Sequence, residues 1–275
     1  MEPSAPVRFV LTLLWAALQS WKFLVVLVLG AIGLTAMCTE LWKDREERGL
    51  KDNEVEKLLK AGDDLFEKGS DVAALAEYDK AMATNAWCRH GQPQFRVALV
   101  KAYQGKFDEA LALLGGRVAA YGAPSACDRG FCHFAAGDFA KAEEDLNRYI
   151  NWKDRDDDPY PFIWFFLAQG RQGKDGRERL AQFRRTCKDN AWSTIIMKHC
   201  LGEITSEHLL SASTTGKAEK LKGQQGEAFF CLGELSLMKK DTKAARDWLT
   251  KAAGLAPCNT WEHIAAKGEL ARVSR

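Results

Sequence analysis

The sequence predicts an all-α protein, in which a solenoid of helical hairpins follows one N-terminal transmembrane helix. Three observations predict it: an uncharged apolar run near the start, helix-length apolar periodicity without strand alternation after residue 53, and one spacing of small residues that recurs four times. With 275 residues, 47% hydrophobic and 28% charged, the chain can bury one large core or two small ones. It is therefore not a disordered tail.

Residues 21–42 are the predicted transmembrane anchor. Residues 23–39 carry no charge, and at 1.5 Å per residue they cover about 25 Å of the roughly 30 Å hydrocarbon layer. Trp and Lys flank this run on both sides, as is typical of the membrane interface. A cleaved secretory signal is the alternative, but its apolar core is usually shorter and nearer the start. We expect an apolar or interfacial segment over residues 1–20 and a charged linker over residues 43–53.

The basic residues around the anchor bear on its orientation. More of them follow the span than precede it, and by the positive-inside rule this would keep the large domain cytoplasmic. Those before the span are Arg8 and Lys22, and those after it are Lys43, Arg45, Arg48 and Lys51.

Residues 54–275 are predicted to form a repeat domain. A small residue is followed twelve positions later by Ala and sixteen positions later by Tyr or Leu, and we expect these residues to meet where two helices of a pair cross. The four sets are Gly62–Ala74–Tyr78, Ala98–Ala110–Leu114, Gly130–Ala142–Leu146 and Gly233–Ala245–Leu249. The third and fourth sets are separated by about three periods of roughly 34 residues, which leaves room for two degenerate repeats.

Turn and cap residues agree with these hairpins. The sequences GKF at 105–107 and GDF at 137–139 place Gly where a helix ends and an aromatic residue where the next begins. Residues 159–183 predict an aromatic helix, a Gly-rich turn and a charged helix, with Asp158 as a cap. Thr205 or Ser206 is expected to cap a short helix that begins at Glu207.

The spacing resembles that of the tetratricopeptide repeat. The last copy matches best, at Phe229, Leu232, Gly233, Ala245, Leu249, Ala252 and Pro257. Residues 158–270 also resemble the bacterial lipoprotein NlpI family, through an Asp-Pro-aromatic start, a Phe-x-Leu-Gly repeat and a closing Asn259, Glu262 and His263.

The NlpI resemblance implies a tetratricopeptide adaptor held at the outer membrane on the periplasmic side. Such adaptors bind proteases and cell-wall hydrolases and do not catalyse. The family is attached through a lipidated cysteine, for which Cys38 is the candidate here, behind Met37 where the family has a small residue. The resemblance implies that the large domain lies in the periplasm, whereas the positive-inside rule predicts that it lies in the cytoplasm.

Catalytic and cofactor motifs are missing from the sequence. Cys127-x4-Cys132-His133 is a stretched haem-attachment motif, but the two thiols would lie about 140° apart around a helix. The acidic run at 154–158 has Pro159 and Phe165 where a calcium loop needs Gly and Glu. HExxH, GxSxG, P-loop and GxGxxG motifs do not occur. We therefore expect no enzyme, no metal and no cofactor.

Charge and cysteine content exclude two further classes. With 39 basic against 37 acidic residues, the chain lacks the basic excess that nucleic-acid binders concentrate on one face. Of eight cysteines one, Cys38, lies in the apolar run. The other seven are an odd number, which argues against a complete disulfide framework and favours buried thiols that pack as small hydrophobes.

The predicted function is therefore a membrane-anchored adaptor or scaffold that binds a protein partner in the repeat groove. By analogy with tetratricopeptide proteins, the concave partner-binding positions are Leu59, Phe66, Phe95, Leu99, Tyr103, Phe131, Phe134, Phe162 and Phe165, of which about half are expected to be core. The alternative is an accessory subunit or assembly factor of a larger membrane complex, packed through Gly30, Ala31 and Gly33. Both a monomer and a homodimer are compatible with the sequence.

Overall fold

The computed structural model describes residues 52–84, 92–153, 157–187 and 191–274. The chain divides into two compact units, Met1–Asn53 and Glu54–Arg275. The predicted anchor at 21–42, with Cys38 and the segment over 1–20, lies outside the described residues. Within the described ranges, no helix combines the length and the apolar character needed to cross a membrane.

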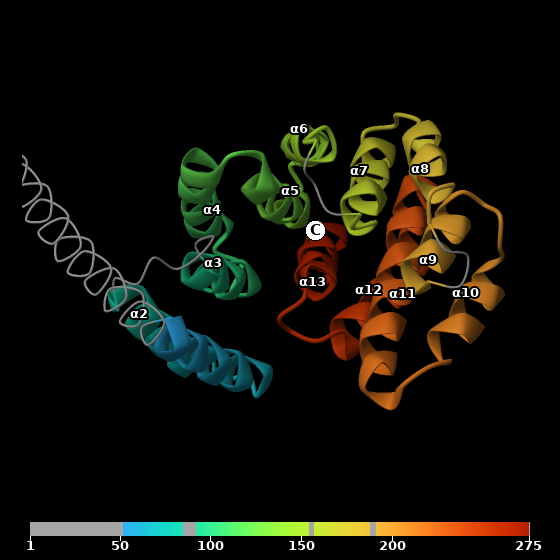
Figure 1. Cartoon of the computed structure of the whole chain (residues 1–275). Coiled ribbons are helices and arrows are strands. Elements are labelled where there is room, and N and C mark those ends of the chain that lie inside the picture. Colours follow the sequence, from blue (N-terminus) through green and yellow to red (C-terminus); the bar gives the residue numbers. More distant parts are fainter. Residues whose placement is uncertain (1–51, 85–91, 154–156, 188–190, 275) are drawn as a thin grey trace, which may run out of the picture. The chain divides into compact units, whose positions relative to one another are not determined.

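Every regular element in the described part of the chain is a helix (Figure 1). In chain order they are a helix over residues 52–67, α2 (Asp71–Ala83), α3 (Gln92–Tyr103), α4 (Phe107–Tyr121), α5 (Ala123–Ala136), α6 (Phe139–Ile150), α7 (Tyr160–Arg171), α8 (Arg177–Arg184), α9 (Trp192–Cys200), α10 (Ser206–Ser213), α11 (Ala218–Met238), α12 (Thr242–Leu255) and α13 (Trp261–Val273). Each helix from α2 to α12 packs against the helix that follows it in the chain. The all-α repeat architecture of tetratricopeptide type is thereby confirmed.

The recurring glycines lie where two helices of a pair come closest. A Cβ atom at Gly62 would lie 2.3 Å from the Tyr78 ring, and one at Gly130 or Gly233 would lie 2.9 Å or 2.7 Å from the side chain of Leu146 or Leu249. The predicted contact is confirmed, and its reason is that Gly makes room for the large residue sixteen positions later. The intervening Ala residues are fully buried beside this contact.

Turns and caps follow the sequence signals. Gly105 and Gly137 have φ angles of 77° and 89°, a left-handed conformation that Gly adopts without strain. Thr205 caps α10 by accepting a hydrogen bond from the His208 backbone N–H, and α10 begins at Ser206, one residue before the predicted start. The sequence predicts Asp158 as the cap of α7, but Pro159 occupies the N-cap position; Asp158 Oδ1 instead accepts a hydrogen bond from the N–H of Tyr160, the first residue of the helix, at 3.0 Å.

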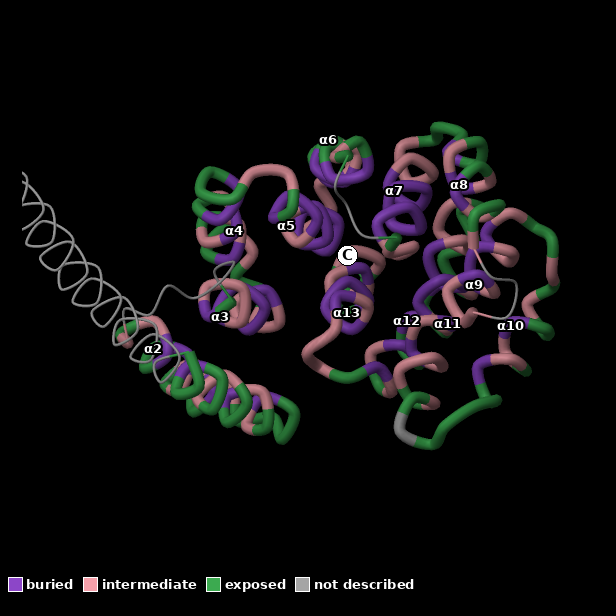
Figure 2. Tube along the Cα trace, viewed as in Figure 1, coloured by how far each residue is buried: buried purple, intermediate pink, exposed green. Residues whose placement is uncertain are grey.

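The core is centred on α7. Its residues Pro161 to Ala168 are all buried, so the helix is enclosed on every side (Figure 2). Trp164 of α7 packs against Phe131 and Phe134 of α5 and Phe230 of α11, with ring centroids 4.9 to 5.0 Å apart. This aromatic cluster joins the first helices of three hairpins.

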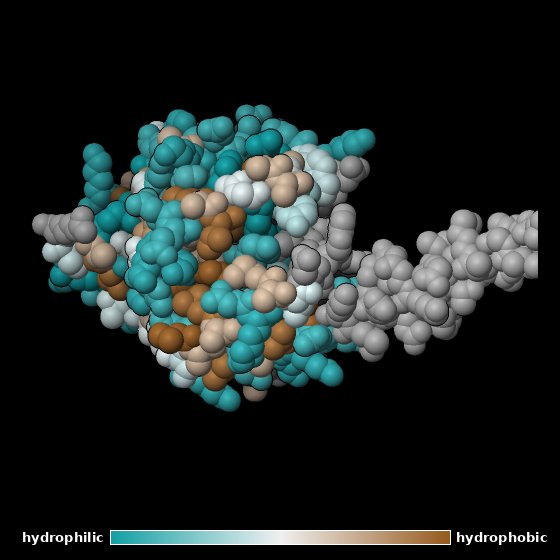
Figure 3. Space-filling model, turned by 90° about the vertical axis from the view of Figure 1, so that its left-hand side faces the viewer, coloured by the Kyte–Doolittle hydropathy of each residue, from teal (hydrophilic) through white to brown (hydrophobic). Residues whose placement is uncertain are grey.

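The surface is mainly polar. On the face in Figure 3, hydrophobic side chains gather in a band between hydrophilic ones. Among the described residues, the large hydrophobic side chains that remain exposed are Val72, at 75%, and Tyr121, at 43%.

Candidate interaction site

The C-terminal helix α13 lies against the inner side of the N-terminal hairpins. It packs on α12 and α11, its neighbours in sequence, and also on α5 (Figure 1). The Trp261 ring lies 6.5 Å from the Phe95 ring and 6.3 Å from the Phe131 ring, centroid to centroid. The His263 ring stacks on the Tyr103 ring at 5.6 Å, and Lys267 Nζ lies 3.9 Å from that ring centroid. We call Phe95, Tyr103 and Phe131 the inner face.

Close contacts with a backbone carbonyl oxygen of α5 also hold α13 in place. A Cβ atom at Gly268 would lie 2.4 Å from the Ala135 carbonyl oxygen, so only Gly permits this approach of α13 to α5. Arg272 Nη1 donates to that carbonyl oxygen at 2.9 Å. Just before α13, Cys258 Sγ donates to the Phe66 carbonyl oxygen at 3.2 Å, and Asn259 donates to Glu67. The C-terminal part of the repeat domain thus contacts its first hairpin.

A buried ionic network joins α13 to α7 and α11. Arg171 donates to Glu234 at 2.8 Å and to Glu269 at 2.5 Å, and both carboxylates are fully buried. Arg272 Nη2 lies 2.8 Å from Glu269 Oε1, the same oxygen that Arg171 Nη1 contacts. Burial and the charge of Glu269 raise the pKa of Glu234 to about 8, against the lowering effect of Arg171. Removal of one member would leave a buried charge without its partner, which makes α13 an integral part of the core.

The structure brings together some of the nine predicted partner-binding residues and separates others. Phe95, Tyr103 and Phe131 contact α13, and Phe66 packs edge-on against Tyr103 at 5.2 Å. Leu99 is buried, Leu59 packs half-buried on the core, and Phe134 belongs to the Trp164 cluster. Phe162 and Phe165 lie against α8 instead, through Phe183 at 3.8 Å and Arg179 at 5.4 Å from the ring.

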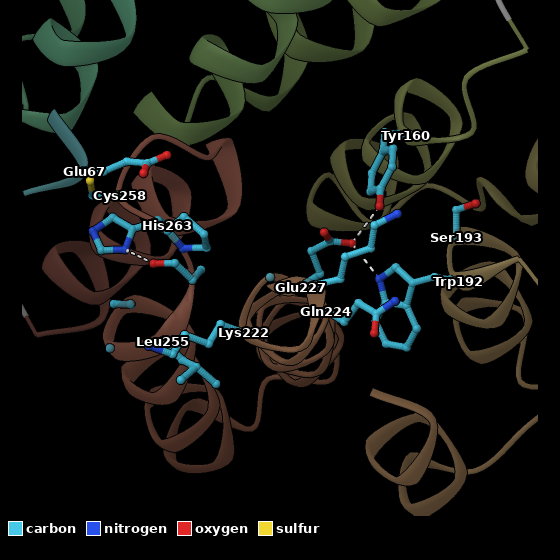
Figure 4. A pocket seen from close by; sticks show the side chains of 16 residues that line it. Glu67, Tyr160, Trp192, Ser193, Lys222, Gln224, Glu227, Leu255, Cys258 and His263 are labelled. Carbon is cyan, nitrogen blue, oxygen red and sulfur yellow. Dashed lines mark hydrogen bonds between the residues drawn. The ribbon is translucent and has the colours of Figure 1, made fainter. Parts of the chain in front are cut away.

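An open pocket of about 850 Å³ lies between α9, α11, α12 and the end of the first helix (Figure 4). Glu227 of α11 stands in it and accepts two hydrogen bonds on Oε2, from the Tyr160 hydroxyl at 2.7 Å and from the Trp192 indole N–H at 2.8 Å. Gln224 Oε1 is buried without a hydrogen-bond partner, and the exposed Lys222 lies at the edge. The pocket therefore offers fixed acceptors beside aromatic rings and an exposed cation.

Buried carboxyl groups give this region its electrostatic character. Burial raises the pKa of Glu227 despite its two donors. Burial and the nearby Glu227 charge raise the pKa of Glu262 to about 8, with a hydrogen bond from Trp164 opposing the shift. At neutral pH Glu262 is mostly protonated, so the pair carries less than two negative charges.

The cysteine and histidine of this pocket have structural partners. Burial raises the pKa of the Cys258 thiol, so it is not a ready nucleophile. His263 Nδ1 lies 3.0 Å from the Ala256 carbonyl oxygen, and burial lowers the pKa of its ring. Both groups are thus hydrogen-bonded to backbone carbonyl oxygens, Cys258 to Phe66 and His263 to Ala256.

A second pocket, of about 640 Å³, lies between α7, α8 and α9. Its lining includes Phe162, Phe183 and Cys187, with Arg179 and Gln182 at its polar side. It shares Ser193 with the larger pocket, so the two hollows adjoin along α9.

Within the described ranges, no three His, Cys, Asp or Glu side chains gather as metal ligands. Cys127, Cys132 and His133 lie in α5 and are buried, as the packing interpretation predicts. His133 faces Asp145, with 3.8 Å between Nε2 and Oδ2. Residues 154–156 of the acidic run lie outside the described part of the chain.

Comparison with known proteins yields likenesses to solved structures alone, and the one described here is distant. No protein-family model matches the chain, and no curated protein matches its sequence. A tetratricopeptide repeat protein from Parabacteroides merdae ATCC 43184 is similar at 12% identity and a TM-score of 0.42, over 81% of this chain and 100% of that chain. The class of protein, an all-α helical repeat of tetratricopeptide type, rests on the helix pairs and their glycine contacts.

Trp164, Trp192, Glu227 and Trp261 are the residues that the sequence patterns do not single out. Each is a single large or charged residue on a different helix, and no spacing connects them. The one available signal was Trp261, which lies between Asn259 and Glu262 of the closing segment.

Proposed function

We propose that this protein is a membrane-anchored adaptor whose repeat domain binds a protein partner. The observation that carries the proposal is a helical-repeat domain with an open, polar pocket of about 850 Å³ in which a carboxylate is held between two aromatic side chains. Stacked helical hairpins commonly present such hollows to segments of other proteins. The fold suits a scaffold, and Cys258 and His263 each have a backbone carbonyl oxygen as hydrogen-bond partner.

The pocket is the favoured partner site because it is open while α13 is in place. The inner face remains the alternative site, and a partner could reach Phe95, Tyr103 and Phe131 only if α13 moved away. These alternatives make opposite predictions for Trp261→Ala, which weakens the α13 contact. Partner binding at the pocket would be unchanged or weaker, whereas binding at the inner face would become stronger.

Site-specific photo-crosslinking in the native cells tests the proposal. A photoreactive amino acid replaces the exposed Lys222 at the pocket, and, as a matched control, the exposed Lys243 on α12. We expect one discrete adduct with another protein at position 222 and none at 243, and its loss in Trp192→Ala. Equal yields of adduct at both positions, or an adduct at position 222 whose yield is unchanged in Trp192→Ala, would contradict a partner site in the pocket.

We further propose that residues 21–42 anchor the protein and that the repeat domain faces the periplasm, as the NlpI resemblance implies. Proteases and cell-wall hydrolases are then the expected partners. Membrane fractionation of the full chain against residues 44–275 tests the anchor. The alternative function, an accessory subunit or assembly factor, predicts that the protein purifies in mild detergent as part of a stable membrane complex. A homodimer predicts that the purified protein has twice the mass of one chain.

A further inference from the structure

We propose that Cys200 and Cys231 form a disulfide bond that ties α9 to α11. The two Sγ atoms lie 3.4 Å apart, and both side chains are buried. A disulfide requires about 2.05 Å, so the sulfurs need to approach by only about 1.4 Å, within reach of small side-chain rotations. Cys200 is the last residue of α9 and Cys231 lies within α11, and the two helices pack together.

The position of the pair gives the bond a structural purpose. Helices α9 and α10 have only 9 and 8 residues, and the buried residues of α10 are Leu209 and Ser213. Short helices with so little buried surface depend on their neighbours for stability. A bond between residues 200 and 231 closes a loop that contains all of α10, and the constraint on the unfolded chain would stabilise this hairpin.

The environment of the thiols indicates when the bond forms. The hydrogen bond between the Cys231 and Cys200 sulfurs, together with burial, raises the pKa of Cys231 well above its ordinary value, so the folded domain holds almost no thiolate there. Thiolate is the species that attacks a disulfide. Oxidation therefore belongs to folding, before α11 covers α9, and not to a later regulatory step.

The reaction balances with a small-molecule disulfide as the oxidant. The Cys200 or Cys231 thiolate attacks a sulfur of oxidised glutathione and releases one glutathione thiolate. The second cysteine then attacks the mixed disulfide and releases another. Two protein thiols are thus oxidised, and one glutathione disulfide is reduced to two thiols. In cells, the bond would form if the domain folds in the oxidising periplasm that the proposed function assigns, whereas refolding in vitro depends on neither location nor partner.

The test is refolding of the full chain, purified in mild detergent, from urea in a buffer of reduced and oxidised glutathione. Trypsin places Cys200 in the peptide 199–217 and Cys231 in the peptide 223–239, each with a single cysteine. After alkylation of free thiols, we expect mass spectrometry to find these two peptides joined, and separated again by dithiothreitol. Recovery of both peptides fully alkylated, or joined to other cysteine peptides instead, would overturn the proposal.

Variants separate a specific pair from random oxidation. Cys132→Ser replaces another buried thiol, on α5, and should leave the joined peptides at the wild-type yield. Cys200→Ser should abolish them and leave Cys231 alkylated. If Cys231 in that variant joined a third cysteine at similar yield, the pairing would be promiscuous and the proposal wrong. In native protein never unfolded, the reduced pair should react with glutathione disulfide far more slowly than during refolding.

Discussion

Replacement of Gly233 by Ala probes the contact on which the repeat assignment rests. A Cβ atom at position 233 would lie 2.7 Å from both Cγ and Cδ2 of Leu249, against about 3.4 Å for an ordinary contact. Leu249 is fully buried, so its side chain has little room to withdraw. Gly223 lies on the same helix, and a Cβ atom there would meet nothing within 4 Å, which makes Gly223→Ala the matched control.

The two substitutions should change stability in opposite directions. Gly to Ala within a helix stabilises by about 0.5–1 kcal/mol, because Ala loses less backbone freedom, and Gly223→Ala should show this gain. Gly233→Ala makes the same gain but adds overpacking, which typically costs about 1–3 kcal/mol. We therefore expect its free energy of unfolding to lie about 1–3 kcal/mol below that of Gly223→Ala.

Urea denaturation of residues 44–275, followed by circular dichroism at 222 nm, measures these differences. Leu249→Ala provides the decisive background, because it removes the atoms that the new methyl group would meet. On that background, Gly233→Ala should stabilise as Gly223→Ala does. If Gly233→Ala stabilised the domain as much as Gly223→Ala with Leu249 in place, the close helix contact would be refuted.

Three further predictions concern α13, the buried acids and a helix cap. Trp261→Ala should cost about 3–5 kcal/mol of unfolding free energy, because Trp261 is buried. Tyr121 is 43% exposed, so Tyr121→Ala should cost well under half as much, and equal effects in urea denaturation would contradict the docking of α13. Glu262 keeps a proton in the folded domain up to pH of about 8 but loses it near 4.5 when unfolded, so Tm should fall as pH rises from 4.5 to 8. Glu262→Gln should make that fall shallower, and an unchanged pH profile would refute the raised pKa. Thr205→Ala removes the α10 cap at a cost of about 1 kcal/mol, seen as faster amide exchange in residues 206–213; unchanged exchange would argue against the cap.

The hairpins could be predicted from sequence because their determinants are local. Gly130 and Leu146 are sixteen residues apart, and close approach of two helices permits only a small residue at the first position. Left-handed turns, as at Gly137, likewise require a residue type that the sequence displays. Spacing and turn chemistry therefore indicated the fold class and the helix ends at the turns 105–107 and 137–139.

The contacts of α13 could not be predicted, because they join residues far apart in the chain. Arg272 and Ala135 are separated by 137 positions, and nothing in either segment marks the other. Aromatic residues on the first helices indicated an apolar surface but not what covers it. Phe162 and Phe165 were assigned to the concave face by analogy with tetratricopeptide proteins. That analogy does not give the position of α8, whose Phe183 and Arg179 contact these two rings.

Amide hydrogen exchange of the free full-length protein most directly tests the central claim that the chain's own C-terminal helix covers the inner face. Residues 261–273 make ring contacts with Phe95, Tyr103 and Phe131 and hold the buried Glu269. We predict that their amides exchange as slowly as those of α5, and faster in Trp261→Ala. Exchange of the α13 amides near the rate of an unfolded chain, with those of α5 protected, would contradict this claim. The inner face would then be accessible to a protein partner.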